Sequence, residues 1–396
     1  MKIAIWWQQE SWGGVDTHLA SMLDAWPDPA DEFTLFHNLD NPGVQRIESA
    51  LGARKVATVA FPEWQASGSG VLGRGFAYVL LPLNFLLWLP RARRLLAANG
   101  PFDALIANNG SYPGAWTCLA ALHAAERQRI PRRMLLVHHA AGGYGVLRQT
   151  FEQLLDRGVT RWATDLVAVS RATRESLIRL RFFNTERNPI RVIHNGVRMA
   201  CAAERNESLR AGWGCGPSDF AIGMVGRVER YKGHEDMLCA MAELAAPLRQ
   251  RVRLVVVGSG PEAERARLTG LAQKLGIAEK LHFTGYMKEE ATYLIRQFDL
   301  LAMVTKDFEG FGLSAAEAMV GGTPVLATSV GGIPEFINPE VGVLVPPESP
   351  TDIARALERI MIDEAGTIAR AARAREHIAG FSDVRMAQRF RSLLSQ

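Results

Sequence analysis

Two glutamates with seven residues between them bracket the segment of the chain best suited to chemistry. Glu309 and Glu317 enclose Gly-Phe-Gly-Leu-Ser-Ala-Ala, which follows the apolar run Leu300–Val304. Backbone N–H groups at a helix start carry partial positive charge, so we expect the amides of Gly310–Ser314 to hold a phosphate or sugar oxygen. A carboxylate accepts two hydrogen bonds at once, so Glu317 suits a vicinal diol such as ribose and Glu309 suits sugar hydroxyls.

A structural alternative exists for the same residues. Ser314-x-x-Glu317 fits a capping box, in which the glutamate only satisfies the backbone at the start of a helix. From these residues alone, capping and ligand binding stay equally open.

A second segment runs from Gly226 to Gly233 and carries Arg227 and Lys232 after the apolar run Ala221–Val225. An arginine fork and a lysine point charge can clamp a diphosphate from two sides, which needs no metal ion. The chain also has no D-x-D motif of the kind that holds a divalent ion on a sugar nucleotide. A basic loop taken alone is more often a solvated surface, so the clamp depends on its pairing with the glutamate segment.

Three weaker signals follow other apolar runs. Gly258 and Gly260 follow Arg253–Val257, and Gly13-Gly14 follows Lys2–Trp6, where tight turns would let a diphosphate approach the backbone. Neither place has the GxGxxG pattern, which argues against a dinucleotide oxidoreductase. His138 ends the run from Met134 and would face a ligand there, although a lone histidine is more often structural.

Alternation of short apolar runs with longer helical patterns predicts an α/β protein with two parallel sheets. Ligands of such sheets bind beyond the carboxyl ends of the strands, where the segments above lie. Residues 199–218 mix Gly, Pro, Asn and charged residues without a strong hydrophobic periodicity, which predicts a linker between two domains. The expected strands are Lys2–Trp6, Phe33–His37, Ala104–Ala107, Met134–His138, Leu166–Val169, Arg191–His194, Ala221–Val225, Arg253–Val257, Leu281–Phe283, Leu300–Val304 and Pro324–Thr328.

Composition and charge narrow the class of protein. With 396 residues, 48% of them hydrophobic, the chain is long enough for two cores. Residues 41–200 hold 21 Lys and Arg against 9 Asp and Glu, which favours anionic partners, but no nucleic-acid motif accompanies them. The four cysteines lie far apart without C-x-x-C spacing, which predicts no metal site. The apolar run at Met1–Trp7 is too short for a signal peptide, which predicts a cytoplasmic location.

The segment Val71–Leu96 is unusually apolar between Tyr78 and Leu89 and continues into Arg91, Arg93 and Arg94. It is too short to span a bilayer, which takes about 20 apolar residues. We expect a helix packed on the sheet, and a peripheral contact with an anionic membrane is the alternative.

Taken in chain order, these segments resemble those of glycosyltransferase family 4, also called glycosyl transferases group 1. Members of this family are retaining enzymes with the two-domain GT-B fold. The resemblance covers most of the chain. Departures occur at His139 and the following Ala140–Gly143, and at His194, where the family usually has proline. The matching segments are Gly13-Gly14, Val169-Ser170, Ile193–Val197, Gly226–Gly233, Val257–Pro261, Phe283–Gly285, Glu309–Glu317 and the closing stretch Phe381–Phe390.

The resemblance implies two Rossmann-like domains facing across a cleft. Residues 1–198 would bind the acceptor, 199–218 would link, 219–375 would bind the nucleotide sugar, and 376–396 would form a helix crossing back to the first domain. The implied catalytic residues are Arg227, Lys232, Glu309 and His138. The implied donor-binding residues are Gly13, Gly14, Gly258, Gly260, Gly285, Gly310, Phe311, Gly312, Leu313, Ser314 and Glu317.

The implied activity is retaining, metal-independent transfer of a sugar from a nucleotide diphosphate to an acceptor hydroxyl. We expect no cofactor, no nucleic acid and a glycan or lipid-linked acceptor, as in polysaccharide or lipopolysaccharide biosynthesis at the inner face of the cytoplasmic membrane. A sugar-nucleotide epimerase or a phosphorylase on the same fold is one alternative. A non-catalytic sugar-nucleotide-binding protein is another, although it would be expected to lack one of Arg227, Lys232 or Glu309.

Overall fold

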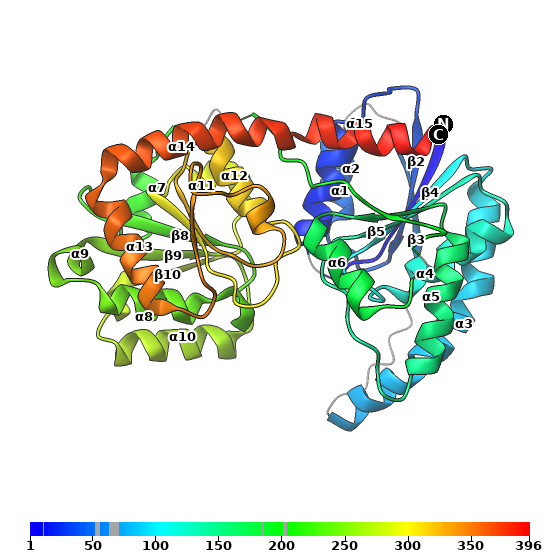
Figure 1. The fold of residues 1–396 in the computed structure, drawn as a ribbon, viewed down its shortest axis with the longest axis horizontal. Coiled ribbons are helices and arrows are strands. Elements are labelled where there is room, and N and C mark those ends of the chain that lie inside the picture. Colours follow the sequence, from blue (N-terminus) through cyan, green and yellow to red (C-terminus); the bar gives the residue numbers. More distant parts are fainter. Residues whose placement is uncertain (11, 52–55, 63–70, 184, 201–203) are drawn as a thin grey trace. The chain divides into compact units, whose positions relative to one another are not determined.

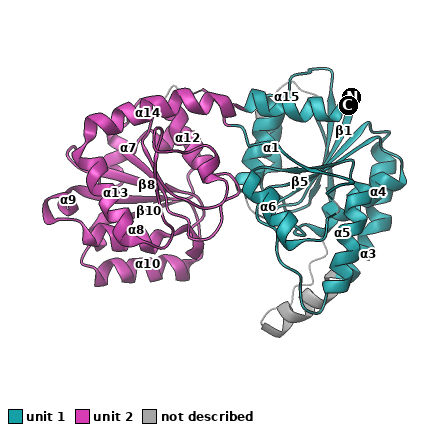
Figure 2. Cartoon of the chain, in the orientation of Figure 1, with its two compact units in different colours: residues 1–196, 383–396 teal, residues 197–382 magenta. Residues whose placement is uncertain are grey.

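The chain forms two compact units, residues 1–196 with 383–396 and residues 197–382 (Figure 2). The computed structural model describes residues 1–396 apart from residues 11, 52–55, 63–70, 184 and 201–203, and the side chains of residues 50 and 71–81 also lie outside the described part (Figure 1). The chain passes from the first unit to the second after Gly196 and returns after Ser382.

The first unit, unit 1, is built on a parallel sheet whose described strands lie in the order β3-β2-β1-β4-β5-β6-β7. Its central strands are buried almost throughout, as expected of a parallel sheet covered on both faces. The order reverses between β1 and β4, where ligands of open α/β sheets bind. The strands are β1 (Lys2–Trp7), β2 (Glu32–Asn38), β3 (Val56–Phe61), β4 (Ala104–Asn109), β5 (Arg132–Val137), β6 (Asp165–Ala168) and β7 (Ile190–Val192).

Helices cover both faces of this sheet (Figure 1). Successive side chains of a strand point to opposite faces. In β1, Ile5 therefore joins the core under α1, α2 and α15, whereas Trp6 joins the core under α3, α4 and α5. The helices are α1 (Gly14–Asp24), α2 (Val44–Leu51), α3 (Val71–Asn99), α4 (Trp116–Arg127), α5 (Gln149–Trp162), α6 (Arg171–Leu180) and α15 (Asp383–Leu394).

Helix α15 returns from the far end of the sequence to complete the core of unit 1. Met386 and Phe390 are buried there with residues of β1, β2 and α1. Arg391 Nε donates to Asp31 Oδ2 at 3.0 Å, and Arg132 donates to the carbonyl of Leu393 at 2.7 Å. The terminal helix is thus an integral part of unit 1.

The second unit, unit 2, has a parallel sheet in the order β10-β9-β8-β11-β12-β13 within its described residues. Here the order reverses between β8 and β11, so the loops after these neighbouring strands meet at one edge. The strands are β8 (Phe220–Val225), β9 (Val252–Val257), β10 (Leu281–Gly285), β11 (Leu300–Met303), β12 (Val325–Thr328) and β13 (Val343–Val345).

Helices again cover both faces of the second sheet. One core lies under α8, α10 and α13, and the other lies under α11, α12 and α14. The helices are α7 (Glu207–Gly212), α8 (His234–Glu243), α9 (Ala246–Arg251), α10 (Glu262–Lys274), α11 (Ala291–Ile295), α12 (Leu313–Gly321), α13 (Pro350–Ile362) and α14 (Glu364–Ile378).

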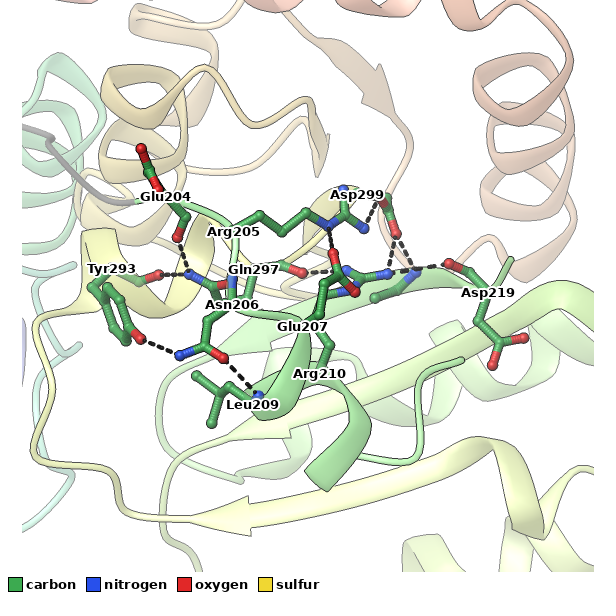
Figure 3. A network of polar contacts seen from close by, with 11 residues as sticks. Glu204, Arg205, Asn206, Glu207, Leu209, Arg210, Asp219, Tyr293, Gln297 and Asp299 are labelled. Carbon is green, nitrogen blue, oxygen red and sulfur yellow. Dashed lines mark hydrogen bonds and ion pairs between the residues drawn. The ribbon is translucent and has the colours of Figure 1, made fainter. Parts of the chain in front are cut away.

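The described part of the segment 199–218, expected as a linker, contains α7 and is fixed to unit 2 by a polar network (Figure 3). Residues 201–203 of this segment lie outside the described residues. Asn206 caps α7 by accepting from the Leu209 N–H at 3.0 Å. Arg210 is almost fully buried and pairs with Asp299 at 3.1 Å, and the carboxylate of Asp299 also accepts from the N–H of Ala221 in β8. These contacts anchor the segment on the sheet.

The α/β class with two Rossmann-like parallel sheets is confirmed. Each expected apolar run contributes a strand, with ends that differ by a few residues. Two strands are additional. Half of the residues of β3 are exposed and Thr58 interrupts its apolar run, and β13 has only three residues, so neither produced a clear signal.

Candidate functional site

Lys232 and Glu309 come together at the carboxyl edge of the unit 2 sheet. Lys232 follows β8 through a single 3-10 turn, Arg230–Lys232, and Glu309 follows β11. Because β8 and β11 are neighbours at the strand-order reversal, their loops meet. Lys232 Nζ donates to Glu309 Oε2 at 2.7 Å.

The ion pair is largely shielded from water, since 23% of the Lys232 side chain and 17% of that of Glu309 is exposed. Burial alone would lower the pKa of Lys232, but the Glu309 carboxylate outweighs it and the pKa is raised. The lysine therefore stays charged at neutral pH. A partly buried cation beside a carboxylate can receive phosphate oxygens, while the carboxylate can receive sugar hydroxyls.

Glycine loops pack backbone to backbone beside this pair. Gly226 donates its N–H to the carbonyl of Val257 at 2.9 Å, and Gly258 donates to the carbonyl of Gly285 at 2.9 Å. A Cβ on Gly258 would lie 2.0 Å from the Gly226 oxygen, and one on Gly260 would lie 2.5 Å from the Val228 oxygen. The loops after β8 and β9 can approach one another this closely because Gly258 and Gly260 lack side chains.

A further glycine supports Glu309 from the loop after β12. Gly332 donates its N–H to the carbonyl of Glu309 at 2.8 Å. Gly331 has a φ of +55°, and a Cβ there would lie 2.0 Å from the same Glu309 oxygen. Sequence reasoning missed Gly331 and Gly332, although a Gly-Gly pair shortly after a strand resembles the Gly13-Gly14 signal.

Helix α12 begins at the glutamate segment, and its N-cap is Gly312, with a φ of +105°. Ser314 therefore lies inside the first turn and does not cap the helix, so the capping-box alternative is wrong. The reason is that Gly312 adopts a left-handed conformation and starts the helix two residues earlier than the serine. Glu317 is half-buried within the helix and is free from that role.

Burial, together with the nearby charge of Glu290, raises the pKa of Glu317 to about 8. The carboxyl group is therefore mainly protonated at neutral pH in the ligand-free protein. Glu290 was not singled out from the sequence, because its effect depends on the position of the β10–α11 loop.

Two other expected donor residues occupy more ordinary surroundings. Phe311 is buried, with its ring stacked on Phe336 at a centroid distance of 4.7 Å, so only its backbone can face a ligand. Arg227 is 53% exposed and pairs with Glu229 at 3.2 Å. Arg227 thus follows β8, as expected, but does not join the Lys232–Glu309 pair.

In unit 1, His138 follows β5 and is buried beside β4. Its Nε2 lies 2.7 Å from Asn108 Oδ1. Because an amide oxygen only accepts, Nε2 carries the proton and Nδ1 is left as an acceptor that has no hydrogen-bond partner among the described residues. Burial, and to a smaller extent the neighbouring His18, holds the pKa of His138 well below its usual range.

His18 projects from α1 against the same ring, at a centroid distance of 4.6 Å, and burial lowers its pKa to about 4. Both imidazoles are therefore neutral near pH 7. Sequence reasoning missed His18 and Asn108. The available signal for His18 was its position, one turn into the helix that follows Gly13-Gly14.

Gly13 is the N-cap of α1, and its N–H donates to Asp16 Oδ2 at 2.6 Å. Asp16 also accepts from the indole of Trp7 at 2.9 Å, which ties the helix start to the end of β1. Gly13 and Gly14 thus lie at the carboxyl edge of the sheet, next to the strand-order reversal.

The loop after His138 is anchored by a buried ionic cluster that the sequence did not suggest. Arg181 donates to Glu152 at 2.8 Å and to Asp156 at 3.0 Å, and all three side chains are buried. Asp156 accepts from the hydroxyls of Tyr112 at 2.7 Å and Tyr144 at 2.6 Å. Tyr144 belongs to the loop, so the cluster fixes its position.

Within the described part of the chain, no group of three or more His, Cys, Asp or Glu side chains is arranged to hold a metal ion. None of the helices, over the residues described, is long and apolar enough to cross a membrane.

Family models match both units. Residues 12–200 match the model described as Glycosyltransferase Family 4, and residues 206–378 match the one described as Glycosyl transferases group 1. An uncharacterized glycosyltransferase of Methanocaldococcus jannaschii is 31% identical over 204 residues, 50% of this chain and 51% of that protein. A D-inositol 3-phosphate glycosyltransferase of Streptomyces bingchenggensis is 31% identical over 257 residues, 61% of this chain and 56% of that protein. The chain thus matches about half the length of these relatives.

Solved structures share the fold. HepE of Anabaena, in complex with UDP, covers the whole of both chains with a TM-score of 0.76 and 22% identity, and it has also been solved with UDP-glucose. At this identity the likeness concerns the fold, which is GT-B. With one family model on each unit and this fold throughout, the chain belongs to the glycosyltransferases of family 4, also described as glycosyl transferases group 1.

Proposed function

We propose that the chain is a retaining glycosyltransferase that moves a sugar from a nucleotide diphosphate to an acceptor hydroxyl without a metal ion. The Lys232–Glu309 contact at the start of α12 carries this proposal. It combines a cation for phosphate, a carboxylate for sugar hydroxyls and a helix N-terminus at one sheet edge.

Each group has a defined part in the proposed reaction. Lys232 and the amides of Gly310–Ser314 bind the diphosphate, with Arg227 turning from Glu229 to join them. Glu309 orients the donor sugar and Glu317 grips the ribose diol. His138, with its unprotonated Nδ1, contacts the donor sugar or the acceptor from unit 1.

The proposed chemistry is a front-face transfer. The bond from the acceptor oxygen to the anomeric carbon forms on the face from which the diphosphate oxygen departs. The acceptor's hydroxyl proton passes to that departing oxygen, so no protein group needs to take it. Charge that develops on the diphosphate is stabilised by Lys232, Arg227 and the helix amides, which is electrostatic catalysis.

We propose a uridine diphosphate sugar as the first donor to test, because the structurally similar Anabaena protein binds UDP and UDP-glucose. The acceptor we propose is a glycan or lipid-linked saccharide of the bacterial envelope, processed in the cytoplasm at the inner face of the membrane. The excess of Lys and Arg in residues 41–200 supports an anionic partner.

A thermal-shift panel of UDP-, GDP- and ADP-sugars tests donor binding, because a ligand stabilises the folded state by mass action. A rise in the unfolding midpoint with one nucleotide class, retained after EDTA treatment, is expected. No shift with any of them would contradict the proposal. Anomeric analysis of the product then tests the mechanism, and inversion relative to the donor would exclude front-face transfer.

A further inference from the structure

Helix α3 has two apolar faces where its side chains are described, and only one is covered. Phe85, Trp88, Ala92 and Leu96, spaced at three and four residues, are buried in the core of unit 1. This face packs the helix onto the sheet and α4, as expected of the apolar segment. The opposite face of α3 is not part of this core.

The opposite face shows three leucines to the solvent. Leu83, Leu86 and Leu87 are 46%, 52% and 42% exposed. Their spacing of three and four residues places them side by side on the helix. Scattered exposed leucines need no explanation, but a contiguous group on one helix face marks a contact surface.

Arginines continue this face toward the end of the helix. Arg93 and Arg94 of α3 line a groove of about 500 Å³ together with His123 and Arg127 of α4. The two helices are joined here, because the Gln128 side chain donates to the carbonyl of Arg93 at 2.7 Å. The sequence of α3, residues Val71–Asn99, contains no Asp or Glu. The surface is therefore apolar and then rich in arginine.

We propose that this surface, Leu83, Leu86, Leu87, Arg93, Arg94 and Arg127, binds the face of an anionic lipid bilayer. The leucines enter the boundary between headgroups and acyl chains, and the arginines of the groove bind lipid phosphates. Charge complementarity favours a bilayer over a second copy of the chain, because two such surfaces would bring their arginines together.

The inference deepens the proposed function by naming the residues that hold the enzyme at the membrane of its acceptor, and it rests on that function only for the acceptor. Vesicle binding needs neither donor nor acceptor. Its failure would therefore leave the donor chemistry untouched, and failure of the donor chemistry would leave the vesicle result standing.

Flotation of the purified chain with phosphatidylglycerol vesicles and with phosphatidylcholine vesicles tests the proposal. Binding to the anionic vesicles at least tenfold stronger than to the neutral ones, and weaker at high salt, is expected. Equal binding to both, or to neither, would overturn it.

Two triple variants separate the apolar and basic parts. Leu83→Ser/Leu86→Ser/Leu87→Ser and Arg93→Gln/Arg94→Gln/Arg127→Gln are each expected to weaken anionic-vesicle binding at least tenfold. The controls are the double variants Ile362→Ser/Ile368→Ser and Arg373→Gln/Arg375→Gln in unit 2, which alter exposed aliphatic residues and exposed arginines and should bind normally. Variants and controls that bind alike would overturn the assignment.

Three further measurements keep the result specific. Unfolding midpoints confirm that every variant is folded, and if a triple variant is not, the single variants Leu86→Ser and Arg94→Gln replace it. Inorganic phosphate at constant ionic strength should not displace the protein from vesicles, and displacement would identify a phosphate site instead of a bilayer surface. Light scattering should give the same mass for all variants, since a mass lowered by the leucine changes would identify an interface between copies.

Discussion

Lys232 and Glu309, 77 positions apart in the sequence, form a 2.7 Å ion pair across the loops that follow β8 and β11. In the proposed reaction each partner serves a different part of the donor, the diphosphate and the sugar. The pair therefore compensates two charges that would otherwise be partly buried without a partner. Donor binding then exchanges one set of charge-assisted contacts for another.

Replacing Lys232 tests its role in the proposed catalysis. Lys232→Ala is expected to lower kcat/KM for transfer by about 100-fold or more, the typical effect of losing one donor to a developing oxyanion. Arg230→Ala is the matched control, because Arg230 lies in the same turn but is 79% exposed and pairs with Glu264. Near-normal turnover of Lys232→Ala, or equal losses in both variants, would contradict the role given to Lys232.

The pKa of about 8 for Glu317 predicts a pH-dependent stability. In the unfolded chain this carboxyl group ionises near its usual value, whereas the folded protein retains the proton. The stability that it contributes is therefore complete at acidic pH and is lost as the pH rises toward 8. Glu317→Gln keeps the group neutral, so its unfolding midpoint should rise relative to the wild type between about pH 5 and about pH 8.5. Parallel pH profiles would show that Glu317 does not titrate this way.

The same group predicts a proton linkage for nucleotide binding. If the ribose diol donates to an ionised Glu317, binding releases a proton, so the affinity for the nucleotide sugar should increase as the pH rises toward 8. Titration calorimetry in buffers of different ionisation enthalpy measures this release. In Glu317→Gln the affinity should be weaker and nearly independent of pH, and a wild-type affinity that does not vary with pH would refute the linkage.

Gly331→Ala should disturb the donor site by displacing Glu309. The new Cβ would lie 2.0 Å from the Glu309 carbonyl oxygen, and the residue would also keep a φ of +55°. Gly322→Ala is the control, because Gly322 has a φ of +69° but nothing within 4 Å of a Cβ. The control should cost only the left-handed strain, about 1 kcal/mol. Gly331→Ala should unfold at lower denaturant concentration than the control and bind nucleotide more weakly, and similar behaviour of both would count against the contact.

Arg181→Met should destabilise unit 1 strongly, because it leaves Asp156 buried without its cation and leaves Glu152 only its ion pair with Arg148 at 3.2 Å. Loss of one partner of a buried ion pair typically costs about 3–5 kcal/mol. Chemical denaturation of the wild type and the variant measures the loss. A loss no larger than that of an ordinary surface substitution would mean that other groups, such as Arg148, compensate the two carboxylates.

The sequence predicted the class of fold because buried parallel strands consist of short runs of apolar residues. It also predicted that Lys232 and Glu309 lie at a strand end. Their contact could not be predicted, because it depends on β8 and β11 being neighbours, and local patterns do not encode strand order. Helix starts were less predictable still, since Gly312 shifted the beginning of α12 through a backbone conformation that only glycine adopts readily.

The buried ionic cluster around Arg181 could not be predicted from the sequence for another reason. Arg181, Glu152 and Asp156 read as surface charges on two amphipathic helices, as most charged residues do. Only the packing of α5 against the loop after β5 and the end of α6 brings them together. Residues that act through such distant partners, like Asn108 behind His138, carry no signal of their own in one sequence.

The return of α15 to unit 1 has a consequence for biosynthesis. Because Met386 and Phe390 belong to the core of this unit, the ribosome must finish all of unit 2 before the core of unit 1 can be completed. Until then the apolar side chains of β1 and α1 that α15 covers lack this covering helix. Unit 2 is one continuous stretch of the chain, residues 197–382. We therefore expect unit 2 to fold during synthesis before unit 1 is complete, although unit 1 begins first in the sequence.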